Sequence, residues 1–170
     1  HLTTLADIHT LYDGDYEGRR DIAVAEVTFE AMNRGDEIIY QGVLRDAETR
    51  TWGSPDFLIR SDVLARLFPN TLNAAEATTS APDLPGGWHY RVVDSKFANL
   101  SLLAGGALGN TGSAPAYKVQ VFLYNRALGR LQGYEPPESF LLGRGWEQKS
   151  GAETTRVQNC MDRLAPVPQD

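Results

Sequence analysis

The chain has 170 residues, a formal net charge of −6 and one cysteine, Cys160. This length allows a single hydrophobic core without covalent staples, which excludes a small disulfide scaffold. One thiol also excludes a four-cysteine zinc or iron–sulfur site within the chain. The scarcity of cysteine fits a reducing compartment as well as any other, and we expect a cytoplasmic location. No apolar run reaches the roughly 18 residues that a membrane span needs, so we expect no membrane contact.

The two ends are typical of a domain cut from a longer protein. The sequence starts at His1 without an initiator methionine or a signal-peptide pattern, and it finishes on the proline-rich run 166–170. We expect residues 1–150 to form one domain and residues 151–170 to form a C-terminal tail or a linker to a missing region.

The first third of the chain predicts two helices. Apolar residues recur at helical spacing over residues 1–12, and an acidic, glycine-containing turn follows over 13–18. A second amphipathic helix is predicted over 21–34, with Asp21 as its N-cap and Gly35 after its last turn.

The middle of the chain changes to a β pattern. Residues 37–60 predict a hairpin whose turn is the polar stretch 46–50. A short helix over 62–68 and a long proline- and glycine-containing loop over 69–87 follow, and residues 88–97 predict a third strand.

The last third predicts one long helix and one strand. After the glycine-rich stretch 99–112, Ser113 and Pro115 open a helix that ends at Gly133. Residues 139–142 predict a last strand, with an irregular tail after it. This order of elements favours an α/β fold with a mixed sheet flanked by helices.

Two acidic residues occupy strand positions where apolar ones are expected. Asp56 follows Pro55 in the second hairpin strand, and Asp94 interrupts a valine-rich strand. A buried carboxylate is costly unless it is paired, hydrogen-bonded or bound to metal. Because strand side chains alternate, Asp94 and Lys96 share one face while Ser95 points away. If the strands are neighbours, Asp56 lies on that face too.

Two carboxylates and one ammonium suit phosphodiester hydrolysis. Mg²⁺ and similar hard cations take oxygen ligands and keep several waters, so two carboxylates and a backbone carbonyl suffice. Such an ion polarises a phosphodiester and acidifies the attacking water, while a lysine orients that water or stabilises developing charge.

The pattern also resembles a known family. Pro55-Asp56 followed by Asp94-Ser95-Lys96 is similar to the PD-(D/E)XK motif of the restriction-endonuclease-like nucleases, and Gln120 with Tyr124 resembles the QxxxY motif of the RecB-like branch. That branch includes exonuclease modules of recombination helicases and CRISPR-associated adaptation nucleases. Further similarity lies in segments 28–32, 38–41, 133–137 and 141–143. Together they resemble predicted bacterial RecB-family nucleases that carry an RNase H-like region downstream.

The resemblance, which covers residues 21–146, implies a restriction-endonuclease-like mixed β-sheet flanked by helices. It implies that Asp56, Asp94 and the Ser95 carbonyl hold Mg²⁺ or Mn²⁺. Lys96 would position the nucleophilic water, and Gln120 with Tyr124 would steady the site or the DNA strand. The implied function is a metal-dependent deoxyribonuclease, a module of a larger DNA repair, recombination or defence protein. Its implied partners are DNA and a helicase or RNase H-like domain.

Two departures from the family pattern stand out. The family carries a further acidic or histidine ligand on an upstream helix, for which Glu26, Glu30 or a residue before His1 are the candidates. The chain also lacks the four-cysteine cluster of the iron–sulfur branch.

Other interpretations remain open. Asp94 with Lys96 could form an exposed edge-strand ion pair, Gln120 and Tyr124 could be polar-tipped core residues, and the fold could bind nucleic acid without cleaving it or act on RNA. We expect no functional site at the three histidines. Residues 105–109 are expected to be a flexible connector, and Cys160 is expected to carry an inert thiol. The excess of acidic residues lies in the first part of the chain. Residues 1–96 contain 9 basic and 16 acidic residues, whereas residues 97–170 contain 7 basic and 6 acidic residues. Bound cations would compensate that charge, so it does not exclude DNA.

Overall fold

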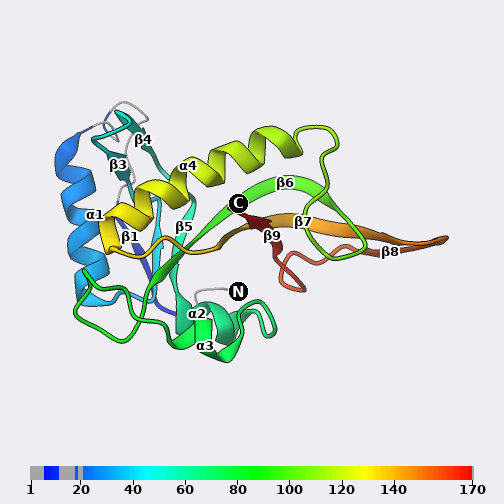
Figure 1. Ribbon diagram of the computed structural model, residues 1–170, viewed down its shortest axis with the longest axis horizontal. Helices are drawn as coiled ribbons and strands as arrows, with labels where there is room; N and C mark the ends of the chain where they lie inside the picture. The colour runs from blue at the N-terminus through cyan, green and yellow to red at the C-terminus, as the bar shows by residue number, and fades with distance from the viewer. Residues whose placement is uncertain (1–5, 12–17, 19–20, 170) are drawn as a thin grey trace.

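The computed structural model describes residues 6–11, 18 and 21–169, which form helices and strands (Figure 1). The helices are α1 (Ile22–Arg34), α2 (Ser61–Leu67), α3 (Ala74–Thr78) and α4 (Ala114–Gln132). The strands are β1 (Ile8–Thr10), β2 (Ile38–Tyr40), β3 (Leu44–Asp46), β4 (Thr51–Gly53), β5 (Phe57–Arg60), β6 (Tyr90–Leu102), β7 (Glu138–Ser150), β8 (Glu153–Val157) and β9 (Ala165–Pro168).

One mixed sheet organises the described chain. Its strand order is β1-β2-β5-β6-β7-β8, and β9 also pairs with β7. The pairs β1–β2 and β6–β7 are parallel, whereas β2–β5, β5–β6, β7–β8 and β7–β9 are antiparallel. Helices lie on both sides of the sheet in Figure 1, so the predicted α/β class with a mixed sheet and flanking helices is confirmed.

The two faces of the sheet build two apolar cores. Ile39, Leu58 and Val92 pack on the face covered by α1 and α4. Residues one position along each strand, such as Ile59 and Val93, pack on the opposite face with α2. This alternation is the period of two that strands impose on side chains, and it determines which polar residues share a face.

Both long helices follow their sequence signals. Asp21 accepts a hydrogen bond from the backbone N–H of Ala23 at 3.0 Å, and Gly35 ends α1 in the left-handed conformation with φ 78°. Gly133 ends α4 in the same way, with φ 70°. A left-handed C-terminal residue strongly favours glycine, which is why these two ends were predictable.

The N-terminal prediction is wrong where the structure describes it. Residues 8–10 form β1, which pairs in parallel with β2, instead of a helix over 1–12. Ala6 and Ile8, two positions apart, both pack against the core under α2. Pairing with a distant strand therefore overrides the local helical spacing. Residues 1–5 and 12 lie outside the described residues, as does nearly all of the predicted turn.

The predicted hairpin is present with an insertion. β2 and β5 pair antiparallel as expected, but β3 and β4 between them form a separate two-stranded sheet. α2 confirms the short helix, whereas the predicted loop over 69–87 contains α3. β6 runs on to residue 102, into the stretch expected to be a glycine-rich connector.

The expectation of an irregular tail after residue 142 is wrong. β7 continues to Ser150, and β8 and β9 pair with its two halves. Leu164, Ala165 and Val167 are buried in the cores. These residues carry little alternation of their own, because two of the four positions in β9 are prolines.

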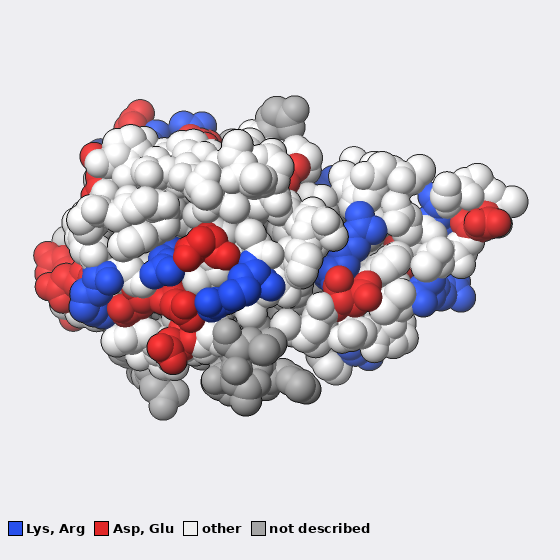
Figure 2. All heavy atoms as spheres, turned by 90° about the horizontal axis from the view of Figure 1, so that it is seen from below, with Lys and Arg blue, Asp and Glu red and all other residues white. Residues whose placement is uncertain are grey.

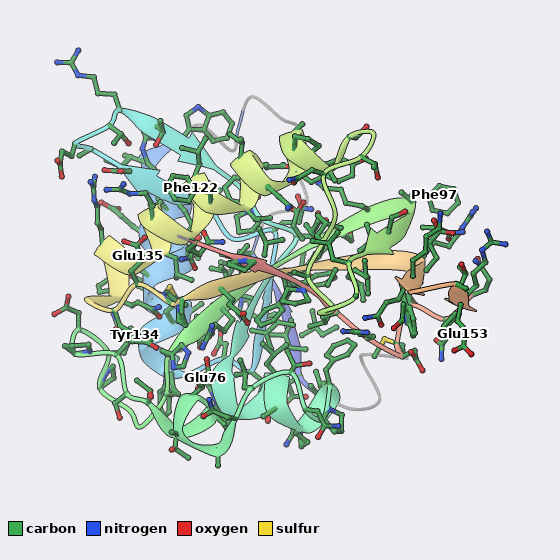
Figure 3. All side chains as sticks on the ribbon, turned by 45° about the vertical axis from the view of Figure 1, so that its right-hand side comes forward. Glu76, Phe97, Phe122, Tyr134, Glu135 and Glu153 are labelled. Atoms are coloured by element: carbon green, nitrogen blue, oxygen red, sulfur yellow. The ribbon has the colours of Figure 1, made fainter. Side chains whose placement is uncertain are left out.

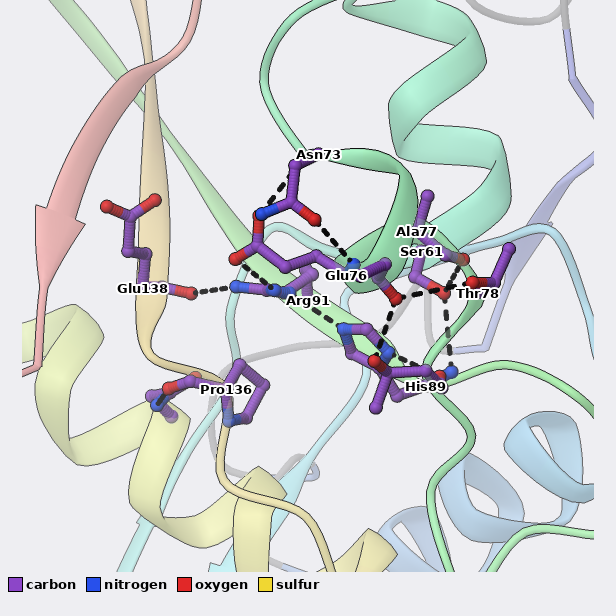
Figure 4. Close-up of polar contacts among 12 residues, drawn as sticks. Ser61, Asn73, Glu76, Ala77, Thr78, His89, Arg91, Pro136 and Glu138 are labelled. Atoms are coloured by element: carbon purple, nitrogen blue, oxygen red, sulfur yellow. Dashed lines mark hydrogen bonds and ion pairs between the residues drawn. The ribbon is translucent and has the colours of Figure 1, made fainter.

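A buried arginine fastens the segment containing α3 to the sheet (Figure 4). Arg91 is fully buried and donates from Nε to His89 Nε2 at 2.8 Å and from Nη1 to the Glu138 carbonyl at 3.1 Å. Its Nη2 lies 3.4 Å from Glu76 Oε1. Because His89 Nε2 accepts, its Nδ1 donates to the Thr79 carbonyl at 2.8 Å. Burial lowers the pKa of His89 to about 4, so the imidazole is neutral in the fold.

On the side of α2 and α3, acidic and basic side chains are interspersed without a continuous patch of one sign (Figure 2). Arg60–Asp62 and Arg66–Glu37 are ion pairs that involve α2. Among the described residues, no helix combines the length and apolarity needed to cross a membrane.

Candidate active site

Three polar residues form a row across three neighbouring strands. Tyr40 pairs with Phe57, and Phe57 pairs with Val93, so the next positions align Gln41, Asp56 and Asp94. The Gln41 N–H donates to the Asp56 carbonyl at 2.9 Å, and the Asp56 N–H lies 3.4 Å from Asp94 Oδ1.

The row lies on the face covered by α1 and α4. Gln41, Asp56 and Asp94 are each two positions from a residue of that core, namely Ile39, Leu58 and Val92. The row also marks the place where pairing between β2 and β5 stops while β6 continues.

The Asp56 carboxylate accepts hydrogen bonds on both oxygens. Gln41 Nε2 donates to Oδ1 at 3.1 Å, and the Ser95 N–H donates to Oδ2 at 2.8 Å. The Ser95 hydroxyl also donates to Oδ2, so the expectation that Ser95 simply points away from the cluster is wrong. β5 begins one residue after Asp56, at Phe57. Next to this start, the Ser95 N–H of β6 therefore donates to the Asp56 carboxylate and not to a backbone carbonyl of β5.

Asp94 is the most buried carboxylate of the row, with 3% of the residue exposed. Its Oδ2 forms an ion pair with Lys96 Nζ. Burial raises the pKa of Asp94, and the negative charge of Asp56 adds to this effect, while Lys96 opposes it. The two carboxylates and one ammonium therefore leave a desolvated site that favours additional positive charge.

Residues of α4 contact the polar cluster formed by Asp56, Asp94 and Lys96. Lys96 Nζ donates to Gln120 Oε1 at 2.8 Å, and Gln120 Nε2 donates to the Tyr124 hydroxyl at 2.8 Å. The ring of Tyr117 lies with its centroid 4.9 Å from Lys96 Nζ. Residues 117, 120 and 124 face the same side of a helix because they are three and four positions apart. A continuous chain of polar contacts thus runs from Asp94 to Tyr124.

The structure brings together the six residues of the two motifs that the sequence analysis singled out. Asp56, Asp94, Ser95 and Lys96 meet at the β5–β6 margin, and Gln120 and Tyr124 reach it from α4. Sequence reasoning missed Gln41 and placed Tyr117 only in the core stripe of the helix. The available signal for Gln41 was a polar residue directly after the apolar run 38–40 and before a glycine.

Glu26 and Glu30 do not join the two aspartates. Both are exposed on α1 and line a separate hollow of about 750 Å³ with the β3–β4 hairpin. Within the part of the chain that the structure describes, no three histidine, cysteine or acidic side chains form a group that could hold a metal ion. Neither glutamate therefore supplies the upstream ligand of the family pattern.

Two hollows open beside the cluster. One of about 310 Å³ lies between β4 and α4 and includes Gln120 and Tyr124 in its lining. The other, of about 230 Å³, lies between Tyr117 and the far part of β6. A Cβ atom added at Gly53 would lie 2.2 Å from Cε1 of Tyr124, so the absence of a side chain there gives the tyrosine its room.

Phe97, directly after Lys96, is 91% exposed. It projects outward where β6 and β7 extend beyond the helices (Figure 3). The Arg144 guanidinium carbon lies 5.4 Å from the centroid of its ring. Exposed aromatic rings with a neighbouring arginine are surfaces on which nucleic-acid bases stack.

The donor set fits a hard divalent cation. Two adjacent carboxylates supply anionic oxygen, and Mg²⁺ or Mn²⁺ commonly takes one or two carboxylates with water for the rest. No protein-family model matches this chain, and no curated protein or solved structure matches it either.

Proposed function

We propose that the chain is a Mg²⁺- or Mn²⁺-dependent nuclease that hydrolyses phosphodiester bonds in DNA. The observation that carries this proposal is the polar chain from Asp56 and Asp94 through Lys96 to Gln120, drawn from three separate elements. The resemblance of these residues to the PD-(D/E)XK and QxxxY motifs supports a RecB-like nuclease with a restriction-endonuclease-like version of the mixed sheet.

Each residue has a distinct task in this proposal. Asp56 and Asp94 hold the cation, together with the Ser95 carbonyl that the resemblance implies. When bound, the cation polarises the phosphodiester and lowers the pKa of the attacking water. Lys96 uses one N–H on Asp94 and one on Gln120, which leaves its third for that water or a phosphate oxygen.

The α4 residues keep the lysine in place. Gln120 accepts from Lys96 and is itself held by Tyr124, so the ammonium needs little reorganisation when the substrate arrives. Phe97 and Arg144 offer a stacking surface for an unpaired base. The net charge of −6 predicts weak DNA affinity without the cation. In this proposal a helicase or RNase H-like region of the same protein supplies the basic contacts that hold the phosphates, and the protein acts in the cytoplasm.

Cleavage assays with matched variants test the proposal. Labelled single- and double-stranded DNA is incubated with wild type, Asp94→Asn, Lys96→Met and the control Asp83→Asn, each with Mn²⁺ and with a chelator. Asp83 is exposed in the segment before β6, outside the cluster. We expect Mn²⁺-dependent cleavage by wild type and Asp83→Asn, and a loss of at least about 100-fold in the other two. Equal cleavage by all four proteins would refute the assignment. A matched RNA substrate separates DNA from RNA specificity, because it differs by the 2′-hydroxyl.

A second candidate is a nucleic-acid-binding module that does not cleave. It is favoured by the lack of a third acidic or histidine ligand among the described residues. Calorimetric titration with Mn²⁺ discriminates the two, because a module without a cation site gives neither heat nor thermal stabilisation while still binding DNA.

A further inference from the structure

Gln41 holds a backbone conformation that glutamine rarely adopts. Its φ is 59°, in the left-handed region. The other described non-glycine residues with positive φ, Arg50 and Asn70, have exposed side chains, whereas only 9% of Gln41 is exposed. Such strain persists where the surroundings enforce it, and it gathers at functional sites.

The orientation of the Gln41 amide is fixed by its partner. An ionised carboxylate only accepts hydrogen bonds, so the donor Nε2 must face Asp56 Oδ1, which lies 3.1 Å away. The opposite end of the amide, Oε1, is then an acceptor. Oε1 is buried and has no hydrogen-bond partner within the described residues. A buried acceptor without a donor is unfavourable unless a ligand or water completes it.

We propose that Gln41 Oε1 binds the hydrated divalent cation held by Asp56 and Asp94, as a further protein oxygen of the site. This inference rests on the proposed nuclease function. It assigns to Gln41 the role of additional cation ligand that neither Glu26 nor Glu30 supplies. Amide oxygens are suitable ligands for hard cations, directly or through a coordinated water. A glutamine adds this oxygen without a third negative charge beside two carboxylates.

A purely structural role for Gln41 makes a different prediction. If the amide only anchors Asp56, Gln41→Glu loses the donor to Asp56 Oδ1 and binds Mn²⁺ more weakly than wild type, as Gln41→Leu does. If Oε1 faces the cation, Gln41→Glu places a third carboxylate there. That variant is then less stable without cation, because like charges repel, and gains more stability than wild type when Mn²⁺ is added.

Mn²⁺ titration calorimetry and thermal denaturation, both without nucleic acid, test the inference. Wild type is compared with Gln41→Leu, Gln41→Glu, Gln41→Asn and the control Gln158→Leu, whose side chain is exposed near the C-terminus. We expect the dissociation constant for Mn²⁺ to rise about 10-fold in Gln41→Leu and to stay unchanged in the control. Gln41→Asn keeps a residue that tolerates positive φ but withdraws the oxygen, so it gives the same loss even if Gln41→Leu does not fold.

The outcomes separate the two proposals. Wild-type Mn²⁺ affinity in all three Gln41 variants, with the same thermal shift as wild type, overturns the role of Gln41 and leaves the cation site intact. If wild type itself binds no Mn²⁺ while remaining folded, the cation site is refuted, and the nuclease function and the role of Gln41 with it.

Discussion

Lys96 Nζ donates a hydrogen bond to Gln120 Oε1 at 2.8 Å, which ties the middle of β6 to one turn of α4. A lysine side chain is long and flexible, so an isolated ion pair with Asp94 would fix it poorly. With Gln120 on one side and the Tyr117 ring 4.9 Å away, the ammonium is confined beside Asp94. The contact explains why two helix residues belong to a site built on strands.

Replacing Gln120 should affect catalysis more than cation binding. Gln120→Leu removes the acceptor of Lys96 but leaves Asp56 and Asp94 in place. We expect the rate of Mn²⁺-dependent DNA cleavage to fall about 10- to 100-fold while the Mn²⁺ dissociation constant changes less than about 3-fold. Single-turnover kinetics and calorimetry measure the two quantities. Tyr124→Phe, which loses only the hydroxyl that holds Gln120, should give a smaller loss, and a larger one would contradict this order of roles.

A methyl group at Gly53 should disturb the site through Tyr124. The added Cβ would lie 2.2 Å from Tyr124 Cε1, so the ring must shift and its bond to Gln120 must lengthen or break. We expect Gly53→Ala to reduce DNA cleavage by about 10-fold. Gly87→Ala is the control, because a Cβ there meets nothing within 4 Å. Equal activity of both variants would show that the position of Tyr124 is unimportant.

Arg91 should be among the side chains that matter most for stability. Its removal leaves His89 Nε2 and the backbone carbonyl of Glu138 without a hydrogen-bond donor in a buried environment. We expect Arg91→Met to lower the free energy of unfolding by about 2–4 kcal/mol in urea denaturation. Arg66→Met breaks the exposed pair with Glu37 and should cost less than about 1 kcal/mol. Similar losses in both variants would contradict the importance of burial.

His89 should make stability depend on pH. Its pKa is lowered from 6.5 to about 4 by burial, so the unfolded chain binds the proton first as the pH falls. The stability is therefore complete above about pH 6.5 and declines as the pH falls toward 4. Between pH 7 and pH 5 the loss due to His89 should be about 1–2 kcal/mol. Urea unfolding at the two pH values should show a smaller loss for His89→Gln than for wild type, and an unchanged loss would rule out this origin.

The sequence by itself predicted the features that are written locally. α1 and α4 have helical spacing and a terminal glycine within a single window, α1 also has the Asp21 cap, and both helices appear at the expected residues. The acidic interruptions at Asp56 and Asp94 were also visible, because a carboxylate in an apolar strand stands out whatever its partners are.

Only the tertiary structure decided what depends on pairing between distant segments. β1 was mistaken for a helix and β9 for a tail, because three or four residues carry too little periodicity to show a strand without its partner. For the same reason the sequence did not indicate a role for Gln41. Its place beside Asp56 follows from the register of β2 on β5, which brings together two residues 15 positions apart in the chain. Its left-handed φ of 59° directs the side chain, and no local sequence pattern indicates that conformation for a glutamine.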